Sequence, residues 1–158
     1  MPRSLALFLT ATALLWSVLI LASPAWLARG GGPTLLAGTV YASASRFCHQ
    51  QSERSFYRGG VQLPVCGRCT GLYFSGAFGA VIAWLPFRRR PRGRDRYLLM
   101  ACAVPTGLTW GMEVAGLASF SNELRALAAL PLGACAGWFF VGTLRDEARV
   151  VPPPCQAI

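Results

Sequence analysis

The sequence predicts an all-α integral membrane protein: one domain, built as a bundle of about four transmembrane helices with a long ordered extracytoplasmic loop. Hydrophobic residues make up 54% of the 158-residue chain and charged residues only 13%, about half the charged share of an average soluble domain. Four apolar stretches and their connections use nearly the whole chain. We therefore expect residues 1–158 to form a single membrane domain.

The first span is predicted at residues 5–26, directly after the short start Met-Pro-Arg. Its apolar part runs for about 18 residues, whereas the apolar region of a signal peptide runs for about 7 to 15. We therefore expect an uncleaved helix. Residues 33–45 are also apolar, but about 13 residues cannot cross a hydrocarbon core about 30 Å thick, which predicts a surface or re-entrant helix.

Three further spans are predicted at residues 71–87, 97–118 and 126–144. The first two of these enclose residues 88–96, which contain six arginines. Short basic loops remain in the cytoplasm, so the chain should lie in the cytoplasmic (inner) membrane as a multi-pass protein with both termini cytoplasmic. Residues 46–70 then form the outer loop, and residues 119–125 close a tight helical hairpin.

The basic residues are all arginine and number 15 against six acidic residues, for a formal net charge of +9. In a soluble chain this excess would favour nucleic-acid binding. Here membrane topology explains it, so we expect no nucleic-acid partner. The expected partners are the lipid bilayer and either another membrane protein or further copies of this chain. Gly107 with Gly111, and Gly133 with Gly137, predict close helix packing within the bundle.

Four short motifs give the chain a family resemblance. They are Cys-His-Gln at 48–50, Glu-Arg-Ser-Phe at 53–56, Leu-Pro-Val-Cys-Gly-Arg-Cys-Thr-Gly at 63–71 and Ser-Asn-Glu-Leu-Arg at 121–125. Together they resemble the bacterial and archaeal membrane proteins classed as domain-of-unknown-function family 2085. The resemblance covers roughly residues 46–137 and implies a multi-span membrane protein, without implying an activity.

Cys66 and Cys69 form a Cys-x-x-Cys at the expected start of a membrane helix, where backbone N–H groups and the helix dipole favour a thiolate. Such a pair supplies half of a tetrahedral zinc site. Cys48 and His49, the only histidine, would be the remaining ligands at a separation typical of zinc sites. The sequence therefore predicts a metal site, with zinc as the metal.

Other interpretations of these cysteines stay open. Adjacent residues seldom bind one ion together, and an outer loop is oxidising, which favours disulfides. An outward Cys-x-x-Cys resembles the quinone-linked disulfide-forming enzymes of the DsbB and vitamin K reductase type, although this chain lacks their second outer pair. A structural disulfide, Cys66–Cys69 or Cys48–Cys66, is the third interpretation, and an accessory subunit of a membrane complex is a further alternative for the protein's role.

Five polar residues are predicted to support the site: Arg54, Arg68, Glu113, Asn122 and Arg125. Glu113 is the only acid within a predicted span, so it needs a partner, and Arg125 across the short hairpin is the natural one. This pair either fixes the hairpin or serves as a proton relay or ligand gate. Asn122 is placed to cap the last helix. The first two arginines either contact an anionic ligand or bind loop carbonyl groups.

Overall fold

The computed structural model describes residues 2–30, 33–85 and 95–150, and over these ranges the chain is mostly helical, as predicted. Its helices are α1 (Pro2–Arg29), α2 (Pro33–Ala44), α3 (Gly67–Ile82), α4 (Asp95–Val114) and α5 (Asn122–Val150). A short 3₁₀ turn (Ser52–Arg54), β1 (Ser55–Arg58) and β2 (Val61–Cys66) lie between α2 and α3. Most of the predicted arginine loop, residues 88–94, falls outside the described residues.

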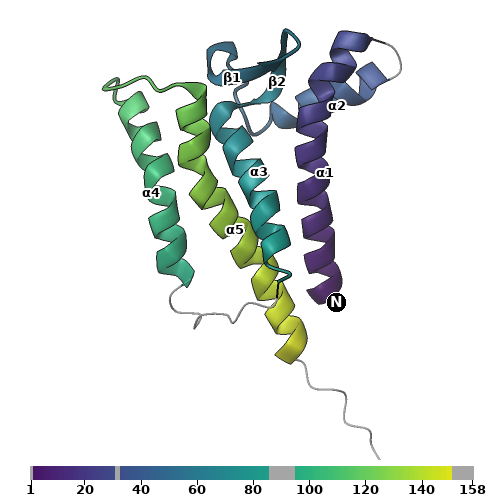
Figure 1. Ribbon diagram of the computed structural model, residues 1–158, viewed down its shortest axis with the longest axis vertical. Helices are drawn as coiled ribbons and strands as arrows, with labels where there is room; N and C mark the ends of the chain where they lie inside the picture. Colours follow the sequence, from purple (N-terminus) through teal and green to yellow (C-terminus); the bar gives the residue numbers. More distant parts are fainter. Residues whose placement is uncertain (1, 31–32, 86–94, 151–158) are drawn as a thin grey trace, which may run out of the picture.

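The four longer helices run side by side, and α2 and the β-hairpin lie together at one end of the bundle (Figure 1). α3 packs most extensively on α5, α1 contacts both of them, and α4 packs chiefly on α5. The start of α1 and the end of α5 lie at the end opposite the hairpin (Figure 1). The hairpin end therefore gathers the starts of α3 and α5 and the end of α4.

Two helices are long and apolar enough to cross a membrane: Arg3–Arg29, with a mean hydropathy of 2.3, and Asn122–Asp146, with 1.7. α3 has 16 described residues, a rise of about 24 Å against a hydrocarbon core of about 30 Å. Neither α3 nor α4 meets this test within the described ranges. The structure thus gives two candidate spans where the sequence predicted four.

Glycine residues allow α3 and α5 to approach each other closely. A Cβ added at Gly71 would overlap the backbone of α5, and one added at Gly133 or Gly137 would overlap atoms of α3. The predicted packing role of the second pair, Gly133 and Gly137, is confirmed. The same prediction for Gly107 and Gly111 is wrong, because both glycines of α4 face open space in the described part of the chain.

β1 and β2 form an antiparallel hairpin that was not predicted. Gly59 and Gly60 join the strands with positive φ angles of 58° and 79°, as a two-residue hairpin turn of type I′ requires. The register pairs Ser55 with Cys66. The hairpin therefore delivers Cys66 to the point where α3 begins.

A small apolar core lies beneath the hairpin and joins it to α1 and α2. Its buried members are Ile20, Ala44, Cys48, Leu63 and Val65. Trp16 of α1 and Tyr73 of α3 pack against it with their rings edge to face, 6.2 Å between centroids. Because Cys48 belongs to this core, packing fixes the position of its thiol.

Candidate metal centre

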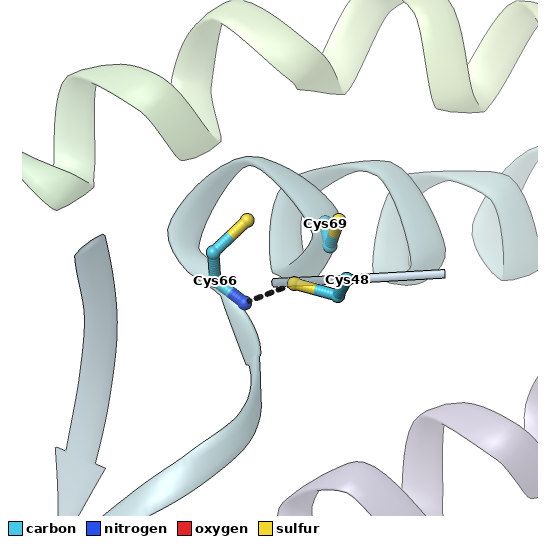
Figure 2. Close-up of side chains that lie close together, drawn as sticks. All are labelled: Cys48, Cys66 and Cys69. Atoms are coloured by element: carbon cyan, nitrogen blue, oxygen red, sulfur yellow. Dashed lines mark hydrogen bonds between the residues drawn. The ribbon is translucent and has the colours of Figure 1, made fainter. Parts of the chain in front are cut away.

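Cys48, Cys66 and Cys69 come together where the hairpin meets the start of α3 (Figure 2). Their three sulfur atoms all lie within 4.8 Å of one another. Cys48 is buried, the other two are half-buried, and all three are free thiols. We call these residues the cysteine cluster, and three sulfurs in this arrangement could hold a metal ion.

Separate chain segments supply the three thiols. Cys66 is the N-cap of α3, and Cys69 lies three residues later in the first turn of the helix. Cys48 comes from the turn after α2, where its backbone N–H donates to the carbonyl of Ala44 at 2.9 Å. The Sγ atom of Cys48 accepts the backbone N–H of Cys66 at 3.2 Å (Figure 2).

The surroundings of Cys48 stabilise its thiolate form. Hydrogen bonds from the side chains of Cys66 and Cys69, followed by backbone N–H groups of Cys66 and Gln50, hold the pKa of Cys48 well below its usual range. Burial opposes this shift but is outweighed. The thiolate is the form of cysteine that binds metal ions. The surroundings of Cys48 therefore favour metal binding by this residue.

His49 does not join the cluster, so only three of the four predicted ligands are brought together. The side chain of Cys48 is buried in the core, whereas the next residue, His49, is exposed at the rim of a neighbouring cavity. Consecutive residues on this turn thus point into different surroundings. The structure thus brings the three predicted cysteine ligands together and leaves His49 outside their cluster.

Two glutamines hold the Cys48 segment against the hairpin, and neither was predicted. Gln50 Nε2 donates to the carbonyl groups of Tyr41 at 2.9 Å and Pro64 at 2.8 Å. Gln62 Nε2 donates to the carbonyl of Gln50 at 2.7 Å. Gln50 also has a φ of +50°, which a non-glycine residue adopts only when its surroundings fix it. The available signal was its place in the Cys-His-Gln motif.

Glu113, in the last turn of α4, binds two arginines. Its Oε1 atom lies 2.6 Å from Arg125 Nε, so the predicted ion pair is present, and its Oε2 atom lies 3.0 Å from Arg68 Nη2. The second partner was not predicted. The Glu113 side chain is only 4% exposed, so both charged contacts are needed to compensate its burial. The three residues tie α3, α4 and α5 together beside the cysteine cluster.

α5 is capped by a different residue from the one predicted. Ser121 Oγ accepts the backbone N–H of Leu124 at 3.3 Å, which is the contact of an N-cap. Asn122 instead uses its side chain for tertiary contacts. Its Nδ2 atom donates to the carbonyl of Ser55 at 3.1 Å, and its Oδ1 atom accepts from Arg125 Nη1 at 2.8 Å. Asn122 thereby links α5 to the hairpin.

A cavity of about 380 Å³ lies beside the cysteine cluster. Three guanidinium groups line it, those of Arg54, Arg68 and Arg125, together with the three cysteines and Trp110. The Arg54 side chain is exposed and forms no ion pair or side-chain hydrogen bond with the described part of the chain. The structure thus brings all three predicted supporting arginines to one cavity.

Comparisons with known proteins agree with the position of this site. A family model described as "Predicted membrane protein (DUF2085)" matches residues 48–139, which include the cysteine cluster and the Glu113 pair. An uncharacterized protein of Methanocaldococcus jannaschii is 32% identical over 89 residues, which span 54% of this chain and 56% of that protein. An uncharacterized protein of Methanothermobacter thermautotrophicus is 31% identical over 86 residues, 54% of this chain and 77% of that protein. No solved structure matches the chain.

Proposed function

This chain belongs to the family of predicted membrane proteins classed as domain-of-unknown-function family 2085, and we propose that its cysteine cluster binds zinc at the outer face of the cytoplasmic membrane. The observation that carries the proposal is the convergence of three free thiols, within 4.8 Å of one another, from the two sides of the hairpin. The surroundings of Cys48 add support, because its hydrogen bonds favour the metal-binding thiolate.

Exposed apolar side chains support contact with lipid along the helices. Only 22% of the apolar window of α1, and 22% of that of α5, is buried within the protein, whereas a core helix of a soluble protein is mostly buried. The exposed large side chains of α4 include Leu98, Met100, Val104 and Leu108. Apolar surface of this extent calls for a partner or a membrane. We therefore propose that α1, α3, α4 and α5 all cross the bilayer.

The proposed orientation places the hairpin end outside the cytoplasm. The end of α3 and the start of α4 lie at the end opposite the hairpin (Figure 1). Residues 88–96, which fall between these two helices in the sequence, contain six arginines. Short basic connections favour the cytoplasmic side. The same end holds the start of α1 and the end of α5, so both termini are proposed to be cytoplasmic.

Zinc fits the donors that the cluster offers. A tetrahedral zinc site has Zn–S bonds of about 2.3 Å, which set sulfur atoms about 3.8 Å apart, inside the 4.8 Å limit of the cluster. With three protein ligands, one coordination position stays open, as in catalytic zinc sites. A zinc ion bound here would supply a Lewis acid. The Glu113 contacts and the two glutamines would hold the ligand-bearing segments in place.

Elemental analysis of protein purified under anaerobic conditions tests the proposal. We expect about one zinc per chain, and we expect it to be lost when Cys48 or Cys66 is replaced by serine, because two remaining thiolates bind zinc weakly. Cys102→Ser is the matched control, since Cys102 lies on α4 outside the cluster. Its zinc content should equal that of the unmodified protein.

One result would contradict zinc binding at the cysteine cluster. Metal-free protein in which the thiols of Cys66 and Cys69 appear only after mild reduction would reject zinc binding and support a membrane thiol–disulfide oxidoreductase. Thiol counting before and after reduction, on the same samples, separates the two outcomes.

A further inference from the structure

The cavity beside the cysteine cluster offers a chemistry that metal binding by three thiolates does not use. Arg54, Arg68 and Arg125 all line this space, and we call it the arginine cavity. We propose that the arginine cavity binds a small oxyanion, a phosphate- or sulfate-like group, through these three guanidinium groups. The proposal does not require metal in the cysteine cluster.

The charged groups around the arginine cavity favour an anion. No acidic residue lines the cavity, and Glu113, which contacts two of the arginines, is the one carboxylate that the described residues place against them. Three positive groups thus face one negative group. If the cysteine cluster held a divalent ion on three thiolates, the cluster would add one net negative charge beside the cavity. With or without metal, the cavity keeps an excess of positive charge, which an oxyanion would compensate.

The guanidinium groups of Arg68 and Arg125 are held in fixed positions. The Glu113 carboxylate holds Arg68 Nη2 at 3.0 Å and Arg125 Nε at 2.6 Å, and Asn122 Oδ1 holds Arg125 Nη1 at 2.8 Å. Each guanidinium carries five N–H donors in a planar fork, so these contacts orient both groups and leave other donors for a ligand. Oxyanions are bound best by such pre-oriented forks.

One buried hydrogen-bond donor at the cavity lacks an acceptor among the described residues. Arg68 Nε is buried and has no hydrogen-bond partner among the described residues. A buried N–H group without an acceptor is costly, and native structures seldom retain one without a ligand or water to satisfy it. Because Arg68 lines the cavity, an oxygen atom of a bound anion could supply this acceptor.

Size and access also suit a small anion. Arg125 is only 7% exposed and Cys48 only 5%, so they form the interior of the cavity, whereas Arg54 and His49 are exposed at its rim. Since one water occupies about 30 Å³, the space of about 380 Å³ holds an oxyanion and several waters. A ligand can therefore enter past Arg54 and reach the buried arginines.

The bound group could be a free anion or the phosphate of a lipid headgroup, because the chemistry is shared. We would purify the full chain in a phosphate-free maltoside detergent and measure thermal unfolding with inorganic phosphate, sulfate or short-chain phosphatidylglycerol. Sodium chloride at equal ionic strength is the reference. Stabilisation by phosphate or sulfate identifies a free anion, and stabilisation by the lipid alone identifies a headgroup. Either result supports the site.

Arg54→Gln is the decisive variant, because Arg54 is exposed and pairs with no described residue, so folding should not depend on it. We expect the concentration of the bound anion needed for half-maximal stabilisation to rise about tenfold, as for loss of one charged hydrogen-bond partner. Arg46→Gln is the matched control, since Arg46 is also exposed but does not line the cavity. It should behave like the unmodified protein.

Two outcomes would overturn the proposal. One is the absence of any stabilisation by phosphate, sulfate or the lipid beyond that of chloride. The other is an equal response of Arg54→Gln and Arg46→Gln. Zinc content measured on the same preparations separates this result from the proposed function, because Arg54 is not a metal ligand and its replacement should leave the metal in place.

Discussion

Glu113 links three helices at the hairpin end of the bundle. Its two oxygens bind guanidinium groups from α3 and α5, and its side chain is almost fully buried. A buried carboxylate with charged partners on both oxygens is stable in the folded state, whereas removal of one partner leaves a charge without compensation. The effects of replacing Glu113 and Arg125 on the free energy of unfolding should therefore be coupled.

A double-mutant cycle measures that coupling. We expect Glu113→Gln and Arg125→Gln each to lower the free energy of unfolding by about 3 kcal/mol. The double variant should lose clearly less than the sum of the two, because each single change already breaks the pair. The measurement is denaturant unfolding in detergent. Arg46→Gln, at an exposed arginine outside these contacts, should leave stability unchanged, and additive losses in the cycle would show that the pair is not coupled.

Residue types and spacing predicted most of the site's members but not all of their contacts. The Cys-x-x-Cys spacing and the distant Cys48 predicted the cluster correctly, because a helix start places Cys66 and Cys69 together. His49 lies outside the cluster, and the sequence does not reveal which way each residue of a turn points. The contact between Arg68 and Glu113 joins residues 45 positions apart, and only the packing of α3 and α4 on α5 brings them together.

The contact between α3 and α5 is the central one among the elements of the fold. Gly71 lies so close to α5 that a methyl group would overlap the backbone of Ala126. Small residues at helix contacts allow the backbones to approach, which supplies the packing energy that lipid does not. This contact also positions the start of α3, where Cys66, Arg68 and Cys69 lie.

Two alanine substitutions test this contact as a matched pair. Gly71→Ala should lower the free energy of unfolding by about 1–3 kcal/mol, as overpacking does. Gly107→Ala places the same methyl group in open space on α4 and should leave stability equal or raise it by up to about 1 kcal/mol, because alanine favours helix. Equal effects of the two substitutions on denaturant unfolding would contradict the close approach of α3 and α5.

The turn between α2 and the hairpin should matter for metal binding through Gln50. Replacing Gln50 with alanine removes its donors to the Tyr41 and Pro64 carbonyl groups and should loosen the segment that carries Cys48. We expect zinc affinity to fall about tenfold or more, as when outer contacts of a metal site are removed. Gln51→Ala is the control, since no side-chain bond of Gln51 holds Cys48. Competition with a zinc-binding dye measures both, and equal affinities would contradict this role.

The hairpin turn has a clear signal in the local sequence, whereas its bulge does not. Gly59-Gly60 stands between two short runs of strand-forming residues, a pattern typical of a type I′ hairpin. The prediction of an outer loop at residues 46–70 did not include this hairpin. The bulge between Ser55 and Tyr57, which adjusts the register beside the site, has no comparable sequence signal.

In the whole molecule, the arrangement of the helices determines which ends of the chain can share one side of a membrane. The start of α1 and the end of α5 lie at one end of the bundle, and the cysteine cluster lies at the other (Figure 1). If the four longer helices cross the bilayer, both termini lie on one side. The sequence predicted this order from apolar stretches, but it could not predict that α3 would be helical only to Ile82 in the described residues.

Reporter fusions test the proposed topology. A fluorescent protein that folds only in the cytoplasm should be bright at either terminus, because the basic residues 88–96 retain that end inside. Alkaline phosphatase at the C-terminus should be inactive. Active C-terminal phosphatase with a dark fluorescent fusion would reverse the orientation and place the cysteine cluster in the reducing cytoplasm.

X-ray absorption at the zinc edge of the anaerobically purified protein tests the central claim most directly, because it counts the atoms bound to the metal. Three cysteines without His49 predict three sulfur neighbours at about 2.3 Å and one lighter atom from a ligand outside the cluster. Cys69→Ser should reduce the sulfur count or abolish metal binding. A protein without zinc, or a zinc ion surrounded only by nitrogen and oxygen, would contradict the account.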